Sequence, residues 1–150
     1  SVQTRNFELR YEAFRQAMRV LDRPVRDTFV YNCDSTFDGA YQDMRGVLHS
    51  GPDLPSALFC TNDIIALGVM KALREAGLHV PQDISLIGFD DLPTSSLMEP
   101  SLTSIAVSKW EIGNTAIAQL TYRMEHREMP AVKIVVGGTL VERNSVKTLR

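Results

Sequence analysis

Apolar residues near the start of the chain recur every three or four positions. This spacing predicts an amphipathic helix over residues 6–21, and Pro24 lies just beyond the end of that pattern. A β-prone run follows at residues 28–31, and a second helical pattern spans residues 36–48. The apolar positions of the first helix are Phe7, Tyr11, Phe14, Met18 and Leu21.

The alternation of strands and helices continues along the rest of the chain. The predicted strands lie at 57–60, 84–89 and 102–107, and the predicted helices lie at 62–76 and 110–124. Ser108 and Glu111 have the spacing of a capping box for the last helix, whose apolar stripe, including Trp110, we interpret as core packing. The alternation predicts an α/β fold with a doubly wound parallel sheet.

The end of the chain is β-prone on both sides of a glycine pair, Gly137 and Gly138. Two glycines between the runs 132–136 and 139–143 suit a hairpin. They equally suit one bent strand that crosses between domains. The sequence leaves both alternatives open.

Composition narrows the possible classes of protein. The 150 residues are 44% apolar and 23% charged, as in a globular domain, and the net charge of −2 with scattered basic residues gives no surface for a nucleic-acid backbone. Two cysteines, Cys33 and Cys60, can in principle pair, but their low number favours reduced thiols. With no membrane-spanning run and no export signal, we expect a cytoplasmic domain. Because the helical pattern starts at once without an initiator Met, we expect a piece of a longer protein.

Polar residues follow each of the first three predicted strands. They are Asn32, Cys33, Asp34 and Ser35, then Thr61, Asn62 and Asp63, then Asp90 and Asp91. Ligands of open α/β sheets bind beyond the carboxyl ends of the strands, and carboxylates, amides and arginine suit a ligand with many hydroxyls. The alternative is structural: Asn62 and Asp63 cap a helix, and Asp90 and Asp91 form a turn.

Enzyme and metal signatures are weak. The histidines His49, His79 and His126 are isolated from cysteines and carboxylates at metal-ligand spacing, so we expect no metal and no cofactor. The pair Asp90 and Asp91 could serve acid–base chemistry, but the sequence shows no nucleophile or base to act with it. We therefore expect a protein that is not an enzyme.

The second half of the chain carries a series of motifs in a known order. After the segment ALFCTNDIIALGVMKALREAG come Val-Pro-x-Asp-Ile-Ser, Gly-Phe-Asp-Asp, Glu-Pro-x-Leu-Thr-Ser-Ile and Leu-Val-Glu-Arg-Asn-Ser. The ordered set closely resembles the effector-binding core of LacI/GalR-type transcriptional regulators. The resemblance covers essentially the whole chain, more loosely before Pro55.

This resemblance implies a set of effector-binding residues. Arg10, Asn62 and Asp90 match the family's ligand-binding arginine, asparagine and aspartate. Asn6 falls at a smaller polar contact, and Asp34 lies near the position of a stacking aromatic residue in several members. The implied ligand is a sugar or sugar derivative.

The chain departs from the family pattern at two positions. Ala13 replaces the glycine of an Arg-x-x-Gly-Phe segment, and Val107 stands where many members place a polar contact. These departures leave the identity of the effector open. Leu67 and Met98 correspond to positions at the family's dimer interface, where exposed apolar side chains would have a partner.

The resemblance also implies an architecture like that of periplasmic binding proteins, with an effector cleft between two lobes. Residues 1–107 would form most of the C-terminal lobe, 108–131 a helix of the N-terminal lobe, and 132–150 a returning strand and tail. The expected protein is a homodimeric, allosteric regulator that binds DNA only through a separate N-terminal helix-turn-helix. The first alternative is a periplasmic sugar-binding protein of a transport system, and the second is a sugar- or nucleotide-acting enzyme.

Overall fold

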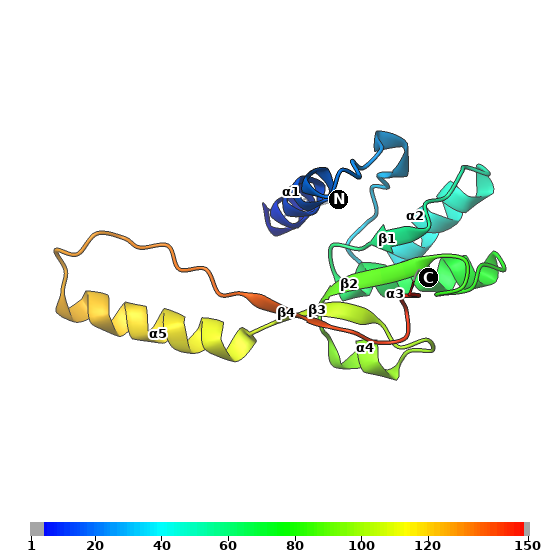
Figure 1. Ribbon diagram of the computed structural model, residues 1–150. Helices are drawn as coiled ribbons and strands as arrows, with labels where there is room; N and C mark the ends of the chain where they lie inside the picture. Colours follow the sequence, from blue (N-terminus) through cyan, green and yellow to red (C-terminus); the bar gives the residue numbers. More distant parts are fainter. Residues whose placement is uncertain (1–4, 149–150) are drawn as a thin grey trace.

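The computed structural model describes residues 5–148 (Figure 1). The helices are α1 (Arg5–Val20), the short 3-10 helix η1 (Asp27–Phe29), α2 (Phe37–His49), α3 (Asp63–Glu75), α4 (Pro93–Leu97) and α5 (Lys109–Glu125). The strands are β1 (Ala57–Phe59), β2 (Ser85–Asp90), β3 (Thr103–Val107) and β4 (Gly138–Val141). Among the described residues, no helix is both long and apolar enough to cross a membrane.

The strands form one sheet in the order β1-β2-β3-β4. β1, β2 and β3 are parallel, with Ile87 of β2 paired to Phe59 and to Thr103. β4 runs antiparallel to β3, and Val107 pairs with Gly138. The predicted α/β fold is confirmed, with an antiparallel strand added at the edge of a parallel sheet.

The core is built mainly by α2, α3 and β2. The buried apolar residues of α3 face those of α2 and the sheet, and Leu73, Leu86 and Leu102 are fully buried. Gly68 lets the two helices approach closely, because a Cβ there would lie 2.6 Å from the carbonyl oxygen of Phe37. The two helices also have side-chain N-caps, Thr36 for α2 and Asn62 for α3.

Two local predictions are wrong. Residues 28–31 form no strand, because the N–H groups of Phe29 and Val30 close the 3-10 turn by donating to the carbonyls of Arg26 and Asp27. Ser108 precedes α5 but makes no capping hydrogen bond through its side chain, since its backbone has a ψ of 72° rather than the extended ψ of the Thr36 cap. Both the 3-10 turn and the missing Ser108 cap depend on backbone dihedral angles, which residue type alone does not determine.

The region of α5 also differs from expectation. Figure 1 shows α5 and the segment after it extending away from the sheet. The stripe that was predicted to be core is exposed: Trp110 is 76% exposed and Leu120 is 64% exposed. Within residues 5–148 no helix or strand packs extensively against α5. Residues 132–136 are not in a strand, so Gly137 and Gly138 do not join a hairpin; β4 pairs instead with β3.

Candidate effector-binding site

The guanidinium group of Arg10, on α1, lies at the carboxyl end of β2. Its Nη2 donates to Asp90 Oδ1 at 2.9 Å, and its Nη1 donates to the carbonyl oxygen of Thr61 at 2.7 Å. The guanidinium carbon also stands 3.9 Å from the centroid of the Phe89 ring. The side chains of Arg10 and Asp90 are 19% and 27% exposed, so the pair is largely shielded but still reachable.

Asn62 lies directly after the Thr61 carbonyl that Arg10 contacts. Its Oδ1 accepts a hydrogen bond from the N–H of Ile65 at 2.7 Å, which caps α3. The structural role considered for Asn62 is therefore present, and it fixes the residue beside the Arg10–Asp90 pair. The structure thus brings together Arg10, Asp90 and the main chain at the start of α3.

The other two predicted contacts, Asn6 and Asp34, are not part of this arrangement. Asn6 is exposed on α1. Asp34 accepts hydrogen bonds from the hydroxyl of Thr36 at 2.7 Å and from its N–H at 2.8 Å, and these bonds lower the pKa of the Asp34 carboxyl. Among the described residues, the hydrogen bonds of Asp34 run to the start of α2 and to Asp43, and none reaches Arg10 or Asp90.

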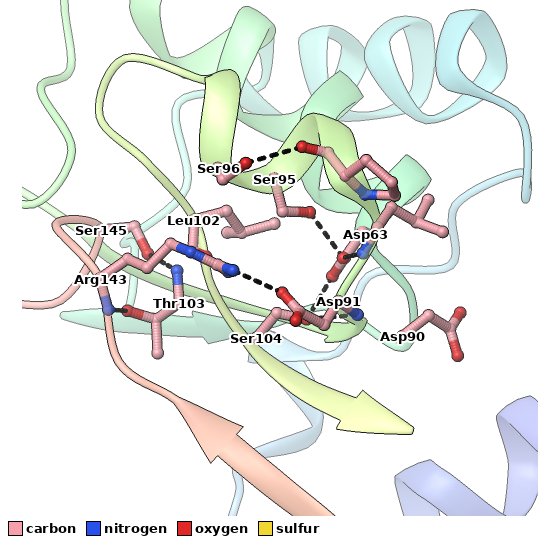
Figure 2. A network of polar contacts seen from close by, with 12 residues as sticks. Asp63, Asp90, Asp91, Ser95, Ser96, Leu102, Thr103, Ser104, Arg143 and Ser145 are labelled. Atoms are coloured by element: carbon pink, nitrogen blue, oxygen red, sulfur yellow. Dashed lines mark hydrogen bonds and ion pairs between the residues drawn. The ribbon is translucent and has the colours of Figure 1, made fainter. Parts of the chain in front are cut away.

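The two neighbouring carboxylates of the β2 end point in different directions (Figure 2). Asp90 pairs with Arg10, whereas Asp91 Oδ1 lies 2.7 Å from Nη2 of Arg143. Each carboxylate thus has its own cationic partner. Among the described residues, no cluster of His, Cys, Asp and Glu could hold a metal ion.

A buried carboxylate, Asp63, which the sequence marked as a strand-end polar residue or a helix cap, lies close to this site. Asp63, fully buried, accepts hydrogen bonds from the N–H of Leu92 at 2.8 Å and from the hydroxyls of Ser95 and Ser104, both at 2.6 Å (Figure 2). Gly88 makes room for it, because a Cβ on Gly88 would collide with the Asp63 carboxylate. The Thr-Asn-Asp and Gly-Phe-Asp-Asp motifs were the available signals, but they do not tell which aspartate is turned inward.

A cavity among the described residues lies beside this site. Its volume is about 750 Å³, and its lining residues come from α1, the segment 23–33, β1 and Thr61, with Met44 of α2 and Ile65 and Val69 of α3. Both cysteines line it as free thiols. Burial, and to a smaller extent the Asp43 carboxylate, raise the pKa of Cys33 to about 11, and burial also raises the pKa of Cys60.

The two predicted dimer-interface residues are less exposed than expected. Leu67 is half-buried on α3, and Met98 is half-buried and packs against the core. The neighbouring Leu97 is 83% exposed. The end of α4 therefore presents an exposed apolar side chain at Leu97 rather than at Met98.

The fold and this site define a class of protein. Residues 1–146 match the periplasmic binding protein-like domain, and the chain belongs to that family. Its curated relatives and solved neighbours include transcriptional repressors and regulators of the LacI family, to which the chain is similar along most of its own length.

Two curated relatives illustrate the similarity. The HTH-type transcriptional repressor PurR of Haemophilus influenzae is 36% identical over 143 residues, which are 93% of this chain and 42% of the repressor. The ribose operon repressor of Escherichia coli is 39% identical over 137 residues, 91% of this chain and 41% of that protein. The chain spans about two fifths of the length of these relatives. Both are repressors, which confirms the prediction of a non-enzymatic family.

Solved structures of regulators show the same similarity to this chain. A regulator named CelR, in complex with cellobiose, superposes with a TM-score of 0.81 at 27% identity, covering 90% of this chain and 41% of the other. A LacI-family regulator from Enterococcus faecium with bound ribose gives a TM-score of 0.81 at 28% identity, covering 96% of this chain and 53% of the other. These similarities confirm the periplasmic binding protein-like fold.

Proposed function

We propose that this chain is the effector-sensing part of a LacI-type regulator and that Arg10, Asn62 and Asp90 bind a small polyhydroxyl effector. The observation that carries the proposal is the Arg10–Asp90 pair at the carboxyl end of β2, the edge at which open α/β sheets bind ligands. A sugar is supported as the ligand class by the similar ribose operon repressor and by the similar solved regulators with bound ribose or cellobiose.

The chemistry of the pair favours an uncharged ligand. Asp90 neutralises the Arg10 guanidinium, and Thr61 and Phe89 hold the guanidinium in place. Asp90 Oδ2 lies 3.4 Å from Arg10, so its bond there is weaker than that of Oδ1 and it remains available to accept from a hydroxyl. A neutral polyol uses such an acceptor without adding charge to the site.

The proposal includes a second lobe, with α5 belonging to it. The exposed stripe of α5 supports this assignment, since apolar patches of this kind usually have a partner. In the assignment predicted from the sequence, residues 1–107 belong to one lobe, 108–131 to the other, and 132–150 return. Effector bound between the lobes would then shift the equilibrium of a separate N-terminal helix-turn-helix on DNA, in a cytoplasmic protein.

The test of the site is Asp90→Ala in the full-length regulator. Because the variant loses a charged acceptor for ligand hydroxyls, its affinity should fall about ten- to hundredfold. Calorimetry with ribose, cellobiose and lactose measures the effect, and Asp53→Ala, an exposed aspartate away from the site, is the matched control. Equal affinity of the Asp90 variant and the parent would contradict the site, and operator binding without sugar should persist.

The proposed dimer is tested through Leu67 on α3. Leu67→Asp would bury an unpaired charge in a two-fold interface, so the dimer should dissociate at concentrations where the parent remains intact. Light scattering on diluted protein measures the mass. An unchanged mass would reject this interface, and Leu97→Asp then tests whether the exposed neighbour of Met98 forms it instead.

A further inference from the structure

The turn that carries Asp90 has an unusual backbone. Asp90 has a φ of 103° and Asp91 a φ of 45°, so two consecutive non-glycine residues have positive φ. Such conformations cost free energy and persist only where surrounding groups hold them. The groups that hold this turn therefore also set the position of the Asp90 carboxylate.

Two cations contact the turn, each at a different residue. Lys109 Nζ donates to the carbonyl oxygen of Asp90 at 2.9 Å, and Arg143 Nη2 lies 2.7 Å from Asp91 Oδ1. Arg143 is itself fixed, because its Nη1 donates to the carbonyl oxygen of Leu102 at 2.8 Å. Neither cation contacts the Asp90 side chain, which is paired with Arg10. They act on the backbone and on the neighbouring carboxylate.

The two cations come from the segments that follow the paired strands β3 and β4. Lys109 is the first residue of α5 and follows β3, whereas Arg143 follows β4 on the return. Because β3 and β4 are antiparallel, Lys109 lies beyond one end of the strand pair and Arg143 lies beyond the other. Among the described residues, the bond from Lys109 is the one side-chain hydrogen bond that joins α5 to the sheet.

We propose that Lys109 and Arg143 are positioning residues for the effector site, which link the placement of the start of α5 and of the segment after β4 to the position of Asp90. The proposal rests on the proposed function, in which Asp90 binds the effector. A displacement of the start of α5 moves the donor on the Asp90 carbonyl, and a displacement of the segment after β4 moves the partner of Asp91. Conversely, a ligand that binds Asp90 and shifts the turn also shifts the start of α5 and the segment after β4.

The first measurement is amide hydrogen exchange in the peptide 89–93, because the N–H groups of Asp91 and Leu92 are bonded to Ser104 and Asp63 while the turn is held. Lys109→Met and Arg143→Lys should each speed exchange there by about fivefold, the factor that corresponds to one lost hydrogen bond. The control is Lys133→Met, which removes an exposed lysine outside the turn. Unchanged exchange in both variants overturns the inference.

The second measurement separates positioning from a purely structural role. Lys109 is exposed, so Lys109→Met should leave the unfolding midpoint unchanged while the affinity for ribose, cellobiose or lactose, whichever the parent binds, falls about fivefold. Faster exchange with parental affinity would overturn the positioning role. If the parent binds none of these sugars, the proposed ligand class fails, and the exchange rates still decide whether the two cations hold the turn.

Discussion

Similar apolar patterns have opposite outcomes in two regions of the molecule. One region is the body formed by α2, α3 and the sheet, and the other is the region of α5. Both α3 and α5 present an apolar stripe, yet Leu73 on α3 is fully buried and Leu120 on α5 is 64% exposed. The difference lies in the partner: α3 packs against α2 and β2, whereas α5 projects away from the sheet (Figure 1). A helical pattern thus predicts a face that needs covering, and only the tertiary structure shows what covers it.

The largest effect should come from the buried polar network of the body. Asp63→Ala leaves Leu92 N–H and the hydroxyls of Ser95 and Ser104 without their buried acceptor, so the free energy of unfolding should fall by about 4 kcal/mol. Urea denaturation measures it. Asp53→Ala, on an exposed loop, should change stability by less than about 0.5 kcal/mol. Equal losses in the two variants would contradict the role of the network.

Two leucine substitutions, one on α3 and one on α5, test the difference between the two regions most directly. Leu73→Ala opens a cavity in a filled core and should cost about 3 kcal/mol, whereas Leu120→Ala in this chain should cost less than about 0.5 kcal/mol. In a protein that contains the proposed second lobe, Leu120→Ala should become costly as well. Thermal unfolding of both variants in both contexts gives the result, and a costly Leu120→Ala in this chain alone would mean that α5 is already packed.

Thiol reactivity compares the same two regions. With a pKa raised to about 11 from an ordinary value of 9.0, Cys33 has about a hundredfold less thiolate at pH 8 than an exposed thiol. Ala118→Cys, on exposed α5, supplies the reference in the same protein. Iodoacetamide labelling followed by mass spectrometry should show Cys33 reacting about a hundredfold more slowly and Cys60 more slowly still. Similar rates at all three thiols would show that the cavity is open to reagent.

The smallest effects should have opposite signs at two helical glycines. Gly68→Ala places a methyl against the backbone of Phe37 and Tyr41 and should destabilise by about 2 kcal/mol. Gly113→Ala on α5 meets no atom within 4 Å and should stabilise by about 1 kcal/mol, because alanine favours helix more than glycine does. Chemical denaturation of the two variants checks the signs, and destabilisation by Gly113→Ala would reveal a contact on that face of α5.

Much of the site could be predicted from the sequence, but its geometry could not. The resemblance placed Arg10 and Asp90 in one site, and the structure brings them into an ion pair although 80 residues separate them. Asp34 illustrates the limit: its polar character predicted a ligand contact, and in the structure its carboxylate accepts hydrogen bonds from Thr36, the N-cap of α2. Local capping competes with ligand binding for the same residue types, and residue type alone does not decide between them.

Apart from residues 28–31 and the short helix α4, the sequence by itself determined the order of strands and helices, because apolar periodicity is a local property of the chain. It also determined the family, because the order of the motifs can be recognised from the sequence alone. The tertiary structure alone decided that Asp63 turns inward while Asp90 turns toward Arg10, and that Lys109 and Arg143 meet one turn from two segments. These features depend on contacts between residues far apart in the chain, and no local pattern records which distant groups will satisfy a buried carboxylate or hold a strained backbone.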